Sequence, residues 1–320
     1  AKDILDNTPA VWENRYKVKG IFDIFSYKKN TEFLMDYGVN PNKPYLRTLD
    51  GLKFFAMLGT VYYSENYYRF GFSKNFGNKD DWSKFLGGEY MQGLMPGYLI
   101  HDIFFFIGGT VATLTIMDIF STRKDNTSSE SAFRQACVRK IFRFWPLYTI
   151  MTLFYWLVLP GFTNGPNGHL IEEYTSQCKD HFWADLLTIG AYLYPNSSCI
   201  DFSWYLQIDF HYFVVLALVL YVCYKMALGD FFMYILLGAL TTISYIFSWW
   251  NFHHYNLVLE SPSGSALEWL QYRKYWFRNP LTRASSYFLG AMFGVYFYTM
   301  YVTRARFEEN NADIDTQTIT

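Results

Sequence analysis

Long apolar runs, each close to the length that crosses a bilayer, constrain this chain more than any other feature. A membrane-spanning helix needs about 20 mostly apolar residues. Runs of that kind lie at 98–120, 141–162, 202–224, 231–250 and 285–303, with a weaker one at 49–66. Soluble domains carry about 25% charged residues, whereas this chain carries 17%. The sequence therefore predicts an all-α polytopic membrane protein with about six transmembrane helices.

The polar segments divide the chain into three expected parts. Residues 1–48 form a polar N-terminal segment, 49–303 a transmembrane domain, and 304–320 a polar C-terminal tail. Lys and Arg are about twice as frequent on the side of the N-terminal segment as on the other, so the positive-inside rule predicts that this side faces the cytosol or the mitochondrial matrix. The chain begins at Ala1 rather than Met, which favours a processed or trimmed start.

The loop 163–201 lies on the opposite side and contains two of the four cysteines, Cys178 and Cys199. Compartments on that side permit disulfides, so we expect these two residues to be bonded. The run 185–194 in the same loop is too short to cross a membrane and is typical of an interfacial or re-entrant piece. The net charge of −1 gives no indication of a nucleic-acid partner.

Ionisable residues inside the predicted spans are the first candidates for function, because placing them in lipid costs about 2.5–3.5 kcal/mol each. Asp102 and Asp209 are such residues. His211 follows Asp209 by two positions, so the two side chains are expected on different faces of one helix. The six histidines show no metal-ligand spacing, and no metal site is expected.

Five short motifs, in one order along residues 46–294, resemble the membrane acyltransferase-3 family in its nose-resistant-to-fluoxetine-like branch. The segments are LDGLK (49–53), HDIFFFIGG (101–109), RKIFRFWPLY (139–148), SWYL with Asp209 (203–209), and TRASSY with Gly290 and Gly294 (282–294). Cys178, Trp183 and Cys199 match the cysteine–tryptophan–cysteine loop of that branch. The pair Gly290 and Gly294 also has the spacing of close helix packing.

The resemblance implies a helical membrane enzyme that moves an acyl group from acyl-coenzyme A to a hydroxyl group. Such chemistry needs a general base beside the hydroxyl and cationic groups for the phosphates of the coenzyme. The resemblance assigns the cavity to eight residues of this chain: Lys53, Asp102, Arg139, Arg143, Trp204, Asp209, Arg283 and Tyr287.

Four departures from the family pattern argue against catalysis. The family's base is a histidine eleven residues after the arginine of the first motif, and here the same count from Lys53 reaches Ser64. Lys53 itself replaces that arginine and lacks its bidentate geometry, and Gly108 replaces a serine of the second motif. Family members also carry several more helices after the last motif, so we expect a shortened cavity.

The sequence therefore predicts a catalytically inactive acyltransferase-like protein with no cofactor. We expect it to act as a structural or accessory subunit of a larger membrane complex, for example of the mitochondrial respiratory chain, with membrane lipids and other membrane subunits as its partners. The mitochondrial inner membrane is favoured over the plasma or endoplasmic reticulum membrane.

Two alternatives remain open at this point. One is an active acyl-coenzyme A-dependent O-acyltransferase in which His101 or His211 replaces the missing base. The other is a lipid or small-molecule binder or transporter lined by Asp209, Arg139, Arg143 and Arg283.

Overall fold

The computed structural model describes residues 45–72, 97–121, 129–162, 164–165, 168–200, 202–257 and 266–319, together with residues 27, 28, 31 and 35. The expected N-terminal segment 1–48 thus lies largely outside the described residues. The chain divides into two compact units, one of Leu52–Met300 and one of Ala1–Gly51 with Tyr301–Thr320.

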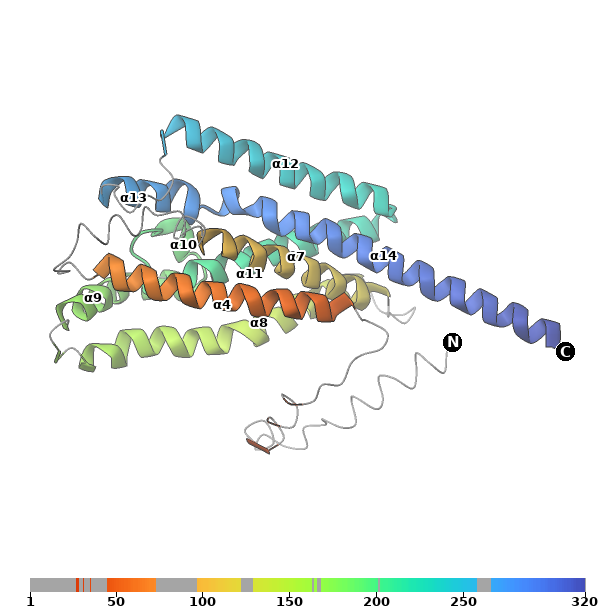
Figure 1. Ribbon diagram of the computed structural model, residues 1–320, viewed down its shortest axis with the longest axis horizontal. Helices are drawn as coiled ribbons and strands as arrows, with labels where there is room; N and C mark the ends of the chain where they lie inside the picture. The colour runs from red at the N-terminus through yellow and green to blue at the C-terminus, as the bar shows by residue number, and fades with distance from the viewer. Residues whose placement is uncertain are drawn as a thin grey trace. The chain divides into compact units, whose positions relative to one another are not determined.

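Every element of the described residues is a helix (Figure 1). The long helices are α4 (Tyr45–Phe72), α7 (Gly97–Ser121), α8 (Ser129–Leu153), α9 (Gly168–Leu186), α11 (Ser203–Lys225), α12 (Asp230–His254) and α14 (Pro280–Ile319). The short ones are the π-helix η1 (Phe154–Val158), the 3-10 helix η2 (Leu159–Phe162), α10 (Gly190–Leu193), α13 (Ala266–Tyr272) and the π-helix η3 (Arg273–Phe277).

Four of the described helical segments are long and apolar enough to cross a membrane. They are Ile100–Ser121, Glu130–Phe162, Ser203–Lys225 and Asp230–His254. The protein is therefore an all-α membrane protein, as the sequence predicted. The two other predicted spans, 49–66 and 285–303, are helical parts of α4 and α14, and the total of six spans stays a prediction.

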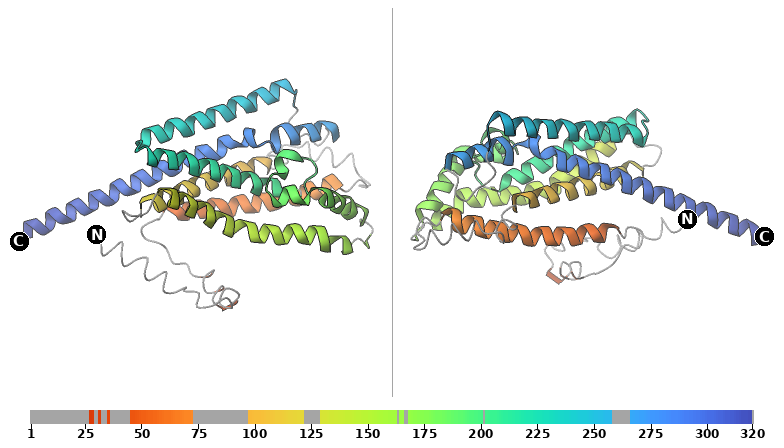
Figure 2. Two further views of the ribbon diagram at one scale, coloured as in Figure 1. Left: turned by 180° about the vertical axis from the view of Figure 1, so that it is seen from behind. Right: turned by 45° about the horizontal axis from the view of Figure 1, so that its top comes forward.

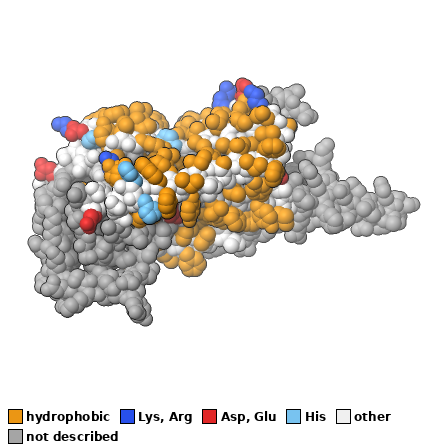
Figure 3. Space-filling model, turned by 90° about the horizontal axis from the view of Figure 1, so that it is seen from above, with side chains coloured by type: hydrophobic (Ala, Val, Ile, Leu, Met, Phe, Trp, Pro, Cys, Tyr) orange, Lys and Arg blue, Asp and Glu red, His pale blue; other side chains and the backbone are white. Residues whose placement is uncertain are grey.

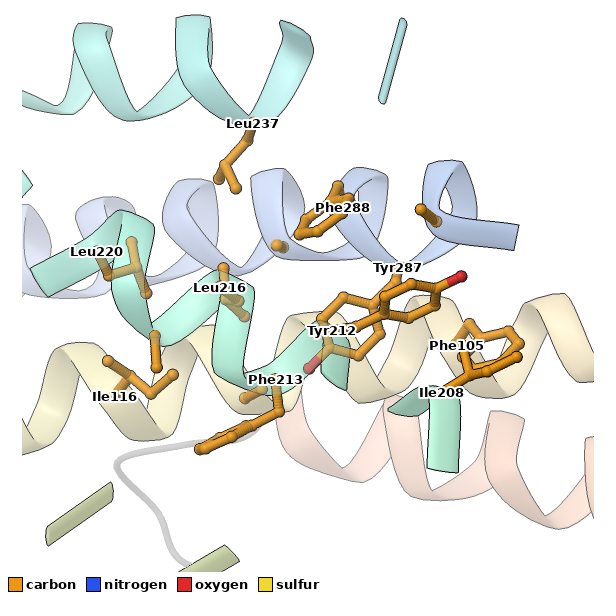
Figure 4. Close-up of a cluster of buried hydrophobic side chains, with 14 of the residues drawn as sticks. Phe105, Ile116, Ile208, Tyr212, Phe213, Leu216, Leu220, Leu237, Tyr287 and Phe288 are labelled. Atoms are coloured by element: carbon orange, nitrogen blue, oxygen red, sulfur yellow. The ribbon is translucent and has the colours of Figure 1, made fainter. Parts of the chain in front are cut away.

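Helix α11 forms the centre of the bundle, because it packs against α7, α8 and α12. Its side chains Ile208, Leu216 and Leu220 are completely buried. Figure 4 shows Leu216 and Leu220 among neighbours from other helices, including Ile116 of α7 and Leu237 of α12. A view from behind shows the same helices running alongside one another (Figure 2). The apolar sequence of α11 thus supplies the core of the fold.

The outer surface of the bundle is apolar as well. On α12, Phe231, Tyr245, Ile246 and Trp249 are each more than 60% exposed, and a broad hydrophobic area covers the face seen from above (Figure 3). Soluble monomers rarely expose apolar patches of more than a few hundred Å². This surface therefore requires lipid or protein to cover it.

Helices α7 and α14 approach so closely that their backbones touch. A Cβ atom added to Gly109 would lie 2.0 Å from the carbonyl oxygen of Tyr287, and one added to Gly290 would lie 2.0 Å from that of Phe106. The hydroxyl of Thr110 donates to the carbonyl of Gly290 across the contact at 2.8 Å. The close packing expected from Gly290 and Gly294 is confirmed, since a Cβ on Gly294 would also lie 2.8 Å from the carbonyl oxygen of Thr110.

Gly290→Ala is expected to lower the free energy of unfolding by about 3 kcal/mol, because the new methyl group meets backbone that has no side-chain freedom to move away. Gly238→Ala in α12 is the matched control, since nothing lies within 4 Å of its Cβ position. That change should stabilise the helix by up to about 1 kcal/mol. Denaturation of both variants in mild detergent checks this, and equal stability of the two would contradict the close contact.

Candidate functional site

A buried ion pair joins α7 to α14 at one end of their contact. Arg283 Nη1 lies 2.6 Å from Asp102 Oδ2, and the exposed fractions of the two side chains are 2% and 25%. Both residues were predicted from the sequence as parts of one cavity, and the structure brings them into direct contact. An ion pair in this environment is strong only when further contacts hold its members in place.

The π-helix η3 supplies those further contacts to Arg283. The Nε atom donates to the carbonyl of Phe277 at 3.1 Å, and the guanidinium carbon lies 4.3 Å from the ring centre of Trp276. Cation–π contacts of this kind add about 0.5–2 kcal/mol. Single π-turns occur frequently at functional sites. Here the π-helix η3 presents the aromatic rings of both Trp276 and Phe277 to Arg283.

Aromatic side chains surround His101, which directly precedes Asp102 in the chain. The ring of His101 lies 5.4 Å from that of Trp204 and 5.8 Å from that of Phe277. Trp204 is 3% exposed, and its ring centre is 4.9 Å from Phe277. His101 and Trp204, both named from the sequence, therefore lie together beside Asp102 in a packed aromatic group.

A second ion pair joins α8 to α11. Lys140 Nζ lies 2.6 Å from Asp209 Oδ2, with exposed fractions of 24% and 15% for the two side chains. The ammonium group also lies 5.2 Å from the ring centre of Phe213. The sequence singled out Asp209 without identifying its partner, which is this lysine.

Gly108 leaves the space in which Asp209 and Tyr287 come together. A Cβ atom on Gly108 would lie 3.1 Å from Asp209 Oδ1 and 3.5 Å from the ring of Tyr287. Tyr287 is completely buried, and its ring lies 5.2 Å from that of Tyr212 (Figure 4). The hydroxyl of Tyr212 in turn donates to the carbonyl of Pro280. The position where the family carries a serine is thus filled by neighbouring side chains.

Two predicted cavity residues lie elsewhere. Arg139 and Arg143 are exposed on α8, so the structure does not place them with Asp102, Asp209 and Arg283. Lys53 and Ser64 are both half-buried residues of α4.

His211 points away from Asp209, as their spacing predicted. Its Nδ1 atom lies 2.7 Å from the carbonyl oxygen of Gln207, and its ring lies 5.1 Å from that of Tyr192. When a carbonyl accepts the hydrogen of Nδ1, the neutral imidazole keeps its lone pair on Nε2. In His211, Nε2 is therefore the ring nitrogen that can act as an acceptor.

A third polar group, which was not predicted from the sequence, is centred on Asp185 and Gln207. Asp185 accepts hydrogen bonds from the backbone N–H of Cys199 and from Gln207 Nε2, both at 2.7 Å. Gln207 Oε1 accepts from the N–H of Ala191 at 2.7 Å, and Nε2 donates to the hydroxyl of Tyr148 at 2.9 Å. Asp185 and Gln207 are both completely buried. The group thereby ties α8, α9, α10 and α11 together.

The disulfide between Cys178 and Cys199 closes this part of the structure, as the sequence predicted. Both cysteines are buried. A stacked pair, Trp156 and Phe182, packs close by with ring centres 4.3 Å apart. In the chain-entropy account, closing a loop of this length adds about 3 kcal/mol of stability.

Burial raises the pKa of Asp185 above its ordinary value, and the hydrogen bonds from Gln207 and the backbone of Cys199 offset this only in part. The folded state therefore binds the proton of Asp185 more tightly than the unfolded state does. The stabilising contribution is complete below the unfolded pKa of about 3.9 and is lost as the pH rises through the folded pKa.

Within the described segments no group of three or more His, Cys, Asp or Glu side chains could hold a metal ion. Among the described residues the geometry offers the ion pairs of Asp102 and Asp209, the half-buried His211, and the buried polar network of Asp185 and Gln207.

Arg283→Met should lower the free energy of unfolding by about 3–5 kcal/mol, since it leaves the largely buried carboxylate of Asp102 without its cation. The double variant Asp102→Leu/Arg283→Met should be more stable than Arg283→Met alone, because no unpaired charge remains. Lys179→Met, which changes an exposed lysine of α9, is the control and should stay within about 0.5 kcal/mol of the wild type. Strictly additive effects of the two changes would contradict a direct interaction between Asp102 and Arg283.

Asp185→Asn is expected to remove one source of pH dependence. The free energy of unfolding of the wild type, minus that of Asp185→Asn, should decrease as the pH rises from about 4 towards 8, since only the wild type loses the bound proton. Detergent denaturation at several pH values measures the difference. A difference that grows with pH would mean that the pKa of Asp185 is lowered rather than raised.

Comparisons of the chain with protein-family models, with curated proteins and with solved structures found no match. The resemblance to the acyltransferase-3 family therefore rests on the sequence motifs, and what it implies for function is a matter of proposal.

Proposed function

We propose that this protein is a catalytically silent, acyltransferase-like membrane protein that serves as an accessory subunit of a larger membrane assembly. The observation that carries the proposal is that the two carboxylates singled out inside the predicted spans are each paired with a basic side chain. Asp102 contacts Arg283, and Asp209 contacts Lys140, at 2.6 Å in each case.

Acyl transfer to a hydroxyl needs a base that can accept its proton and cations that can meet the phosphates of the donor. Arg283 is 1% exposed and lies under Trp276 and Phe277, so reaching it would require a phosphate to displace both rings and Asp102. Lys140 would have to break its ion pair with Asp209 before it could bind a phosphate. In the family's base position Ser64 offers a hydroxyl, which does not accept protons at neutral pH. These features support a scaffold more than an enzyme.

The exposed apolar surface supports the proposed role as an accessory subunit of a larger assembly. The apolar residues of α12 include Trp249 and Trp250, 64% and 45% exposed, and aromatic residues are enriched in the cores of protein interfaces.

We assign the assembly to the mitochondrial inner membrane, in line with the distribution of Lys and Arg and with the disulfide-bonded loop on the opposite side. Protease protection of that loop in isolated mitochondria tests the assignment.

An active O-acyltransferase is the second candidate, and His211 is the observation that favours it. The ring is half-buried, and its hydrogen bond to the carbonyl of Gln207 leaves Nε2 able to accept a proton. A hydroxyl substrate beside Nε2 would have the base that Ser64 does not supply.

An acyl-transfer assay separates the two candidates. Membranes containing the protein are incubated with labelled acetyl- or palmitoyl-coenzyme A, with the membrane lipids as acceptors, and we expect no transfer above membranes that lack the protein. Transfer that is lost in His211→Ala or His101→Ala, but kept in the exposed control His253→Ala, would establish the enzyme instead.

Purification in two mild detergents tests the accessory role separately. We expect the protein to elute with a constant, stoichiometric set of partner subunits in both. Elution as a lone monomer in both would remove the support for an accessory subunit, whatever the transfer assay shows.

A further inference from the structure

The basic motif of α8 divides between the inside and the outside of the bundle. Lys140 turns inward to Asp209, whereas Arg139 and Arg143 are exposed. Residues four positions apart lie on the same face of a helix, so the two arginines form one cationic site on the outer surface, one helical turn in length.

Apolar side chains lie on that same face of α8, both between the arginines and after them. Phe142 lies three residues after Arg139 and is 74% exposed, and Ile150 lies seven residues after Arg143 and is 63% exposed. Both spacings keep side chains on one face of a helix. The outer face of α8 therefore presents two cations together with exposed hydrocarbon.

The two cations have no carboxylate to neutralise them within the described residues. Asp209 and Asp102, which lie in the neighbouring helices, are bound to Lys140 and Arg283. Arg139 and Arg143 belong to the candidate span Glu130–Phe162, where an unneutralised charge is costly. Long arginine side chains reach towards the headgroup layer and leave their methylene groups against hydrocarbon.

We propose that Arg139 and Arg143 bind the phosphate of an anionic phospholipid whose acyl chain lies along Phe142 and Ile150. Guanidinium groups bind phosphate through paired hydrogen bonds, and basic residues beside a membrane attract anionic lipids by about 1 kcal/mol each. A soluble phosphate compound would gain nothing from the exposed hydrocarbon, which is why the site fits a lipid. The site is independent of whether the interior is catalytic.

The test compares nanodiscs of phosphatidylcholine alone with nanodiscs that also contain phosphatidylglycerol. Native mass spectrometry should show phosphatidylglycerol retained by the wild type, with affinity reduced on the order of thirtyfold in Arg139→Gln/Arg143→Gln. The control Arg134→Gln/Lys179→Gln removes the same charge from exposed positions and should behave as the wild type does. Equal retention by the wild type and Arg139→Gln/Arg143→Gln would overturn the proposal.

Two further measurements keep the test decisive. Inorganic phosphate or coenzyme A, added to phosphatidylcholine nanodiscs, should not raise the melting temperature of the wild type; an arginine-dependent rise would show that the site takes a soluble anion. If the glutamine variant does not fold, a photoreactive phosphatidylglycerol is cross-linked to the wild type. Cross-links should fall within 139–151, and cross-links confined to 231–250 would place the lipid elsewhere and refute the site.

Discussion

Charges that enter a bundle of apolar helices must find partners, and the ion pair of Asp102 with Arg283 is where this constraint acts most strongly. The pair can form because Gly109 and Gly290 let α7 and α14 touch along their backbones. A larger residue at either glycine would separate the helices and leave a buried charge without its partner. The glycines and the ion pair are therefore one feature, in which the small residues set the distance and the charges fix which parts of the two helices face each other.

The second pair applies the same constraint to α8 and α11. Gly108 contributes no side chain to the space beside the carboxylate of Asp209, and Lys140 Nζ lies 2.6 Å from Oδ2 of that carboxylate. Replacing a buried ion pair with well-packed apolar residues is often neutral or even stabilising. The two pairs are thus better understood as determinants of how the helices align than as large sources of stability, and this is the role that a scaffold requires.

Features that depend on local composition were predictable from the sequence. The apolar runs gave the helices, the cysteines of one polar loop gave the disulfide, and the spacing of Gly290 and Gly294 gave the close contact. Features that depend on how a helix is rotated about its own axis were not predictable from the sequence. Arg139 and Lys140 are neighbours about 100° apart around α8, and composition does not indicate which of them faces Asp209. The pairing of Asp185 with Gln207 joins residues 22 positions apart, through a turn in which Thr188 adopts a positive φ of 61° without the glycine that usually marks such a position.

The rotation of α8 about its axis places Lys140 inside the bundle and Arg139 and Arg143 outside it, and this bears on function. Residues 139, 140 and 143 lie within about 100° of one another around the helix, yet the structure turns only Lys140 inward and leaves Arg139 and Arg143 exposed. With Lys140 bound to Asp209, the two arginines face outward, where the abundant anions of a membrane are lipid phosphates. The same turn of α8 therefore contributes one cation to the alignment of the helices and two to the surrounding lipid. The opposite assignment, with the arginines inside, would bring two cations to the single carboxylate of Asp209 and leave one of them unneutralised.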